Sequence, residues 1–113
     1  LEKFLASGYE IQITELDFTI NFDTEGSNAS YSYRNENETD AHQEKFVKNL
    51  MKTIVAKQKN RDKSVNPKGI TSVTLWGLCD STSWRAPCEP LLFGENITEP
   101  KASFFAFIEA AKG

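Results

Sequence analysis

The stretch Ile11-Gln12-Ile13-Thr14-Glu15-Leu16-Asp17 is an apolar strand pattern that ends on two carboxylates. Burial without a partner strips an ionised carboxylate of its hydration, so an apolar strand normally avoids acids. By the period of two along a strand, Ile11, Ile13 and Glu15 share one face. The pattern therefore fits either a catalytic carboxylate at the carboxyl end of a barrel strand or a structural Glu paired with a buried Arg or Lys.

The length and net charge of the chain further limit its possible folds and partners. At 113 residues the chain is long enough for one modest domain and too short for a complete (β/α)8 barrel of roughly 250 residues. The net charge of -3 gives no reason to expect a nucleic-acid or membrane-surface partner. No apolar run approaches the roughly 18 residues that span a bilayer. With two cysteines, one histidine and no cluster of ligands, we expect neither a metal site nor a cofactor.

The hydrophobic pattern predicts the order helix, strand, helix, strand, helix. Residues 1–8 resemble the end of a helix closed by a glycine C-cap at Gly8, and because the sequence opens inside this element we expect a fragment of a longer protein. A helix is expected from Asp40, with Gln43 as its capping-box partner. The strands are predicted at residues 10–18 and 70–78, and the last helix from about residues 98–100.

Both long helices have apolar residues at helical spacing. Those expected to face the core are Phe46, Leu50 and Ile54, flanked by Val47, Met51 and Val55, in the first helix, and Ala102, Phe105 and Ile108, flanked by Phe104, in the second. Strands separated by helices indicate βαβ units and a parallel sheet. The predicted fold class is therefore α/β, with about two βα units. Because the strand edges would be unpaired, we expect either pairing between copies of the chain or a compact layer.

Four motifs together resemble glycoside hydrolase family 10, the endo-β-1,4-xylanases. Thr14-Glu15-Leu16-Asp17 is similar to the family's nucleophile motif. Residues 73–80 followed by Ser83-Trp84-Arg85 are similar to its eighth strand and the loop after it. Residues 90–93 and 99–102 resemble its closing segment. The resemblance spans residues 1–111 and implies that residues 1–113 are the C-terminal portion of a TIM (β/α)8 barrel, its seventh and eighth βα units.

The resemblance implies a retaining mechanism, with two carboxyl groups roughly 5–5.5 Å apart. Glu15 would be the nucleophile, and Asp17 would either orient its neighbours or cap the chain locally. Trp76 and Trp84 would form the wall around the bound sugar, although a place in the core also fits their pattern. Arg85 would either support a carboxylate or bind a sugar hydroxyl.

The family's general acid/base has no counterpart in this sequence, because the Asn-Glu pairs at residues 35–38 lie in a polar loop. We therefore expect the isolated chain to be nearly inactive, with xylan or xylo-oligosaccharide and the missing N-terminal part of the barrel as partners of a secreted parent protein. The alternatives are a non-catalytic carbohydrate-binding or assembly module and a barrel hydrolase that prefers cellulose-type glycans.

Other features leave alternatives open. Cys79 and Cys88 could close the loop around Trp84 as a disulfide in a secreted protein, or remain two free thiols. Tyr31 and Tyr33, in the polar segment 21–39, could stack on sugars or belong to an unstructured loop. The cations of residues 45–68 fit a solvated helix face, and His42 an exposed position. Three glycosylation sequons begin at Asn28, Asn37 and Asn96.

Overall fold

The computed structural model describes residues 1–19, 40–86 and 89–113. Their elements follow the predicted order: α1 (Glu2–Ala6), β1 (Ile11–Leu16), α2 (Asp40–Asn60), β2 (Ile70–Leu75), the 3-10 helix η1 (Asp80–Thr82) and α3 (Ala102–Ala111). Three predicted boundaries are wrong. The first strand ends before residue 18, the second strand ends before residue 78, and the last helix begins after residue 100.

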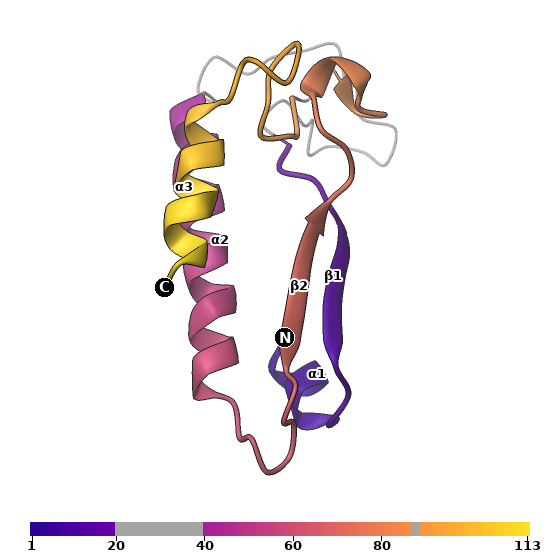
Figure 1. Ribbon diagram of the computed structural model, residues 1–113, viewed down its shortest axis with the longest axis vertical. Coiled ribbons are helices and arrows are strands. Elements are labelled where there is room, and N and C mark those ends of the chain that lie inside the picture. Colours follow the sequence, from indigo (N-terminus) through magenta and orange to yellow (C-terminus); the bar gives the residue numbers. More distant parts are fainter. Residues whose placement is uncertain (20–39, 87–88) are drawn as a thin grey trace, which may run out of the picture.

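β1 and β2 form a parallel pair, with α2 as the crossover between them. Helices α2 and α3 lie side by side along one side of the strands, and α1 lies near the amino end of β1 (Figure 1). Residues 17–19, after β1, and the described part of the loop after β2 lie at the carboxyl ends of the strands (Figure 1). This arrangement confirms the predicted βαβ unit and the α/β class. No helix in the described part of the chain is long and apolar enough to cross a membrane.

The simple two-residue alternation in β1 does not continue to its end. Ile11 and Ile13 pack against the core as expected, but the next side chain to do so is Leu16 rather than Glu15. The register with β2 shifts between Ile13 and Leu16. An irregularity of this kind reorients the side chains that follow it. Glu15 is consequently exposed instead of continuing the apolar row.

The apolar face predicted for α2 is confirmed at Val47, Met51 and Ile54, which are buried, and it is wrong at Phe46, which is 59% exposed. Gln43 is also buried, although it is polar. The capping-box prediction for Gln43 is also wrong, because this side chain is buried and its amide bonds carbonyl groups outside the helix. A side chain pointing inward cannot reach back to the start of its own helix.

Helix α3 buries a face that differs in part from the predicted one. Small residues, Ser103, Ala106 and Ala110, are buried, while Phe105 is 57% and Ile108 is 40% exposed. Small side chains allow two helices to approach closely, and α3 packs directly on α2. Phe104 packs against the core as expected, so the prediction is wrong for the row of Ala102, Phe105 and Ile108 and confirmed for Phe104.

The amino end of the sheet is closed by turns that need special backbone conformations. Gly8 has a φ of 81° directly after the last turn of α1, which confirms the predicted glycine C-cap. In the turn that leads into β2, the buried Asn66 donates to the carbonyls of Leu5 and Tyr9 and accepts from the N–H of Gly69. These bonds attach the turn to α1 and to the start of β1.

Candidate active site

The carboxyl ends of β1 and β2 bring the predicted site residues into one region. The N–H of Trp76 donates to the carbonyl of Leu16 over 3.2 Å, so Trp76 lies beside the end of β1. Glu15, the residue before Leu16, is exposed. In parallel sheets the carboxyl ends of neighbouring strands share an edge, which is the usual location of active sites in α/β barrels. The backbone therefore places the candidate nucleophile and one candidate sugar-binding tryptophan at the same edge of the sheet.

Trp84 belongs to the same region through a direct contact with the segment after β1. Its indole Nε1–H donates to Oδ2 of Asp17 over 2.9 Å. The Arg85 guanidinium carbon lies 4.0 Å from the centroid of the Trp84 ring, a cation–π distance. Asp17 and Arg85 thus hold the indole from its edge and from its face.

Neither tryptophan is a core residue in this chain. Trp76 is 52% and Trp84 is 63% exposed. An indole offers a flat apolar face and one N–H donor at its edge. The two rings therefore suit the binding of a flat, hydroxyl-bearing ligand such as a sugar.

Among the described residues, Glu15 does not form the structural ion pair that its sequence context also allowed. Within the described ranges no Lys or Arg pairs with it. By contrast Asp17 is half-buried, and its Oδ1 atom is buried without a hydrogen-bond partner in the described part of the chain. The two carboxylates thus have different environments, one open to a ligand and one held against an indole.

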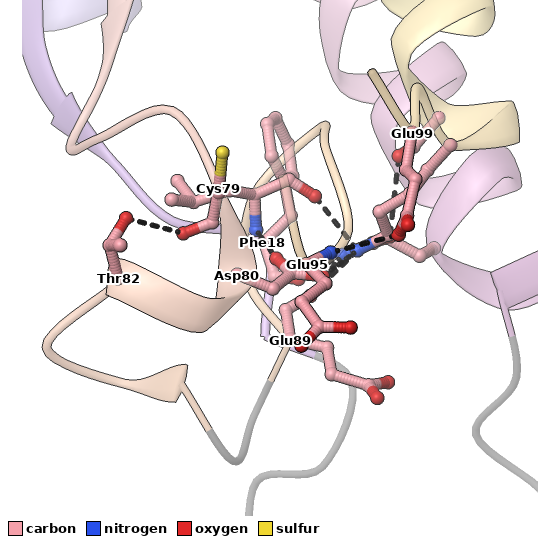
Figure 2. A network of polar contacts seen from close by, with 11 residues as sticks. Phe18, Cys79, Asp80, Thr82, Glu89, Glu95 and Glu99 are labelled. Carbon is pink, nitrogen blue, oxygen red and sulfur yellow. Dashed lines mark hydrogen bonds and ion pairs between the residues drawn. The ribbon is translucent and has the colours of Figure 1, made fainter. Parts of the chain in front are cut away.

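A buried ion pair supports the loop that follows β2. The ammonium group of Lys101, just before α3, donates to Oδ2 of Asp80 over 2.9 Å and to the carbonyl of Leu91 over 2.8 Å. The other oxygen of Asp80 accepts from the N–H of Leu91. Asp80 and Cys79 lie in the same polar network (Figure 2). Burial raises the pKa of Asp80 above its usual value, and this effect outweighs the bonds from Lys101 and Leu91.

Sequence reasoning did not assign a role to this pair. Asp80 and Lys101 both lie within the quoted motifs, at the start of the loop and just before the last helix. An acid and a base on opposite sides of a loop of apolar and proline residues is a signal for a buried pair, but it has no fixed spacing. The pair is recognised only when the loop closes.

The remaining predictions divide between described and undescribed residues. Cys79 is a buried free thiol, and Cys88 lies outside the described residues. Tyr31, Tyr33 and the sequon residues Asn28 and Asn37 also lie outside them. Among the residues that the structure does describe, no group of three His, Cys, Asp or Glu side chains could hold a metal ion.

Comparisons with known proteins agree with this geometry. The sequence profile of glycosyl hydrolase family 10 matches residues 1–110. The chain is 33% identical over 112 residues to the bifunctional endo-1,4-beta-xylanase XylA of Ruminococcus flavefaciens, covering 99% of this chain and 9% of that protein. It is 32% identical over 110 residues to endo-1,4-beta-xylanase A of Butyrivibrio fibrisolvens, covering 97% of this chain and 21% of that protein.

Solved structures of xylanases share the fold. The xylanase 10B modules of Clostridium thermocellum, complexed with xylohexaose, superpose with a TM-score of 0.68 at 27% identity, covering 94% of this chain and 17% of that one. A glycosylated family 10 endo-beta-1,4-xylanase from Gloeophyllum trabeum gives a TM-score of 0.66 at 26% identity, with coverages of 99% and 30%. The chain thus spans a third or less of these relatives, and over nearly its whole length it belongs to glycosyl hydrolase family 10.

Proposed function

We propose that the protein carrying this chain is a retaining endo-β-1,4-xylanase in which Glu15 is the nucleophile. The observation that supports this most directly is the meeting of Glu15, Trp76 and the Trp84–Asp17 pair at the carboxyl ends of β1 and β2. An exposed carboxylate beside exposed indoles can reach the anomeric carbon of a sugar that stacks on them. Its relatives include endo-1,4-beta-xylanases and a xylanase solved with xylohexaose.

Each site residue has a role in this proposal. Glu15 attacks the anomeric carbon from the face opposite the leaving group, so that a covalent glycosyl-enzyme forms and water later releases the sugar with retained configuration. Trp76, Trp84 and Arg85 hold the sugar. Asp17 supports the Trp84 indole through the 2.9 Å hydrogen bond. No metal or cofactor takes part in this reaction scheme.

The general acid/base lies outside this chain in our proposal, as does most of the barrel. The two βα units form the C-terminal part of a (β/α)8 barrel, the seventh and eighth units. The outer edges of β1 and β2, which pair with no further strand among the described residues, pair with the rest of the barrel. Departure of a sugar alkoxide needs a proton, so the 113 residues alone are nearly inactive on xylan. Since xylan is an extracellular polymer, we place the protein outside the cell.

The test is hydrolysis of an activated aryl β-xyloside by the protein that carries this chain. Such a leaving group needs little acid help, so its release reports on the nucleophile. We expect Glu15→Ala to lower kcat/KM by about 1000-fold or more. Azide should restore turnover and yield the α-xylosyl azide, because a small anion entering from the nucleophile side inverts the β-linkage.

Glu10→Ala is the matched control, since Glu10 is an exposed carboxylate just before β1, at its amino end. It should leave kcat/KM unchanged. Full activity of Glu15→Ala, or equal losses in both variants, would refute the nucleophile role. Binding of xylo-oligosaccharides by a wild-type protein that releases no aryl group would favour the non-catalytic carbohydrate-binding module.

The preference for xylose over glucose in the substrate needs a separate experiment. One relative, 30% identical to this chain, is named exoglucanase XynX, from Acetivibrio thermocellus. The aryl β-xyloside is therefore compared with the corresponding β-glucoside at equal leaving-group reactivity. A higher kcat/KM for the xyloside supports the xylanase proposal, and a higher value for the glucoside supports a preference for cellulose-type glycans.

A further inference from the structure

The carbonyl oxygen of Glu89 accepts hydrogen bonds from two side chains of different elements. The amide Nε2 of Gln43, on α2, donates to it over 2.7 Å, and the ammonium Nζ of Lys101 donates over 3.0 Å. Glu89 has a φ of 46°, a left-handed conformation that is unusual for a residue other than glycine. The two donors stabilise the orientation in which this carbonyl points inward, which offsets the backbone strain.

Gln43 also bonds the segment that follows β1. The same Nε2 donates to the carbonyl of Phe18 over 2.8 Å, and the N–H of Phe18 donates to the carbonyl of Pro90 over 2.8 Å. Phe18 directly follows Asp17, the residue that accepts from the Trp84 indole. One amide group therefore connects the segment after the candidate nucleophile to the loop that contains the tryptophan.

The Gln43 amide is itself fixed and shielded from water. Its Oε1 accepts from the hydroxyl of Ser103 on α3 over 3.3 Å, and the side chain is only 1% exposed. Phe18 is also 1% exposed. Figure 2 shows Phe18, Asp80 and Glu89 in a single polar network close to the ends of the helices. Because these groups are shielded from water, leaving a carbonyl group without a hydrogen bond would be costly. The three hydrogen bonds of Gln43 therefore favour a single arrangement of the segments that they join.

We propose that Gln43 is a positioning residue of the active site: by bonding the Phe18 and Glu89 carbonyls together, it sets the placement of the Trp84 loop relative to Glu15. This inference rests on the proposed function. Gln43 touches neither the sugar nor the reacting atoms. It acts through the backbone of two loops that contain the site residues, and its loss lets the indole move relative to the carboxylate.

Helix α2 provides a matched control for this role. Gln58 lies on the same helix and bonds the backbone at the amino end of β2, donating to the carbonyl of Lys68 and accepting from the N–H of Ile70. A glutamine that only stabilises the fold should behave alike at either end of the helix. Only Gln43 lies next to the loops at the carboxyl ends of the strands.

The experiment compares Gln43→Met with Gln58→Met in the protein that carries this chain. Methionine keeps the length of the side chain and removes its hydrogen bonds. We expect Gln43→Met to raise KM for xylo-oligosaccharides about tenfold with kcat changed less than about threefold, because Glu15 remains in place. Gln58→Met should lower the melting temperature to a similar extent and leave KM unchanged.

Ser103→Ala is the milder second variant, used if Gln43→Met does not fold. Alanine favours helix, and the change removes only the hydroxyl that fixes the Gln43 amide. It should raise KM about threefold. An unchanged KM in whichever of these two variants folds, or an equal rise in Gln58→Met, would overturn the inference.

Failure of this inference and failure of the proposed function give different results. A wild-type protein that hydrolyses the xyloside and loses activity in Glu15→Ala, but whose KM is indifferent to Gln43→Met and Ser103→Ala, retains the function and loses the positioning role. If the wild type binds xylo-oligosaccharides without hydrolysis, the same variants are compared by the dissociation constant, with the same expected ratios. A wild type that neither hydrolyses nor binds them refutes both.

Discussion

The two ends of the β1–β2 pair are each organised by a buried side-chain amide, yet the amides join different things. At the amino end, Asn66 bonds the backbone of Leu5, Tyr9 and Gly69 and so closes a turn onto α1 and the start of β1. At the carboxyl end, Gln43 bonds two loops to each other across the ends of the strands. Both amides are 1% exposed.

The ends differ in what they leave in contact with solvent. At the amino end, Arg61 donates to the carbonyls of Gln58, Asn66 and Pro67, so the turn is closed by its own side chains. At the carboxyl end the network is beneath the surface, and Glu15 and the two indoles stay exposed above it. Under the proposed function, one end stabilises the fold, while the other uses similar bonds to hold the candidate site residues in place.

The largest expected effect comes from breaking the buried pair beneath the carboxyl end. Lys101→Met leaves Asp80 without its cation, and both side chains are 11% exposed in the wild type. We expect the free energy of unfolding to fall by about 3–5 kcal/mol, measured by denaturant titration. Lys112→Met, which removes an exposed pair with Glu109, is the control and should cost less than about 1 kcal/mol. Equal losses would show that the buried pair is not special.

At the amino end, Asn66→Ala should destabilise the protein without affecting the site. The change leaves the Leu5 and Tyr9 carbonyls and the Gly69 N–H without their bonds, so we expect a loss of about 3 kcal/mol in the free energy of unfolding. KM for xylo-oligosaccharides should stay the same below the melting transition. A raised KM would contradict the division of roles between the two ends.

Glycine substitutions compare the backbone constraints at the two ends of the β1–β2 pair. Gly69 has a φ of 67°, and a Cβ atom there would lie 2.2 Å from Oε1 of Gln58 and 2.5 Å from Cδ of Arg61. Gly69→Ala should therefore cost about 2 kcal/mol of unfolding free energy, from the left-handed conformation and the displaced side chains. Gly94→Ala is the counterpart at the carboxyl end, where the nearest atom is the flexible carboxylate of Glu99 at 3.1 Å. A larger loss for Gly94→Ala would contradict this reading.

At the carboxyl end, Trp84→Phe tests the indole separately from the fold. Phenylalanine keeps an aromatic face and loses the N–H that donates to Asp17. Because Trp84 is exposed, the melting temperature should change little, while KM rises about fivefold. Phe105→Leu, another exposed aromatic position but on α3, should leave KM unchanged. An unchanged KM in Trp84→Phe would argue against a role of this hydrogen bond in binding.

The smallest expected effect is a change in pH dependence. The pKa of Asp80 is raised in the folded state, so the folded state holds this proton more tightly than the unfolded chain does. The stabilisation by the protonated Asp80 is complete at pH values below the pKa of the unfolded chain, near 3.8. It is lost as the pH rises through the higher pKa of the folded state. The free energy of unfolding of the wild type relative to Asp80→Asn should therefore decrease as the pH rises through that window. A relative increase would mean that the ion pair with Lys101 outweighs burial.

The sequence was a good guide where local patterns and backbone needs coincide. The long apolar periodicity predicted α2, and Gly8 predicted the end of α1. The placement of Glu15 on the face of Ile11 and Ile13 was wrong, because the strand register shifts before it. Four motifs in order predicted the family, which the profile match over residues 1–110 confirms. These patterns are reliable because each depends on residues close together in the sequence rather than on distant segments of the fold.

The prediction failed where a side chain's environment came from distant segments. Gln43 fits a capping box in sequence, but Phe18, Glu89 and Ser103 surround it in the fold. Phe105 was expected in the core because it is large and apolar, whereas close packing of α3 on α2 selects the small face instead. Neither outcome follows from spacing along a single helix.

By itself, the sequence determined the α/β class, the order of the elements and the family, and it supplied candidates for the residues that react with or bind a sugar. Only the tertiary structure decided that Asp17 pairs with Trp84, that Asp80 pairs with Lys101 and that Gln43 joins the two loops. The physical reason is that local propensity and periodicity act between residues a few positions apart. Buried polar groups must instead find partners wherever the folded chain places them.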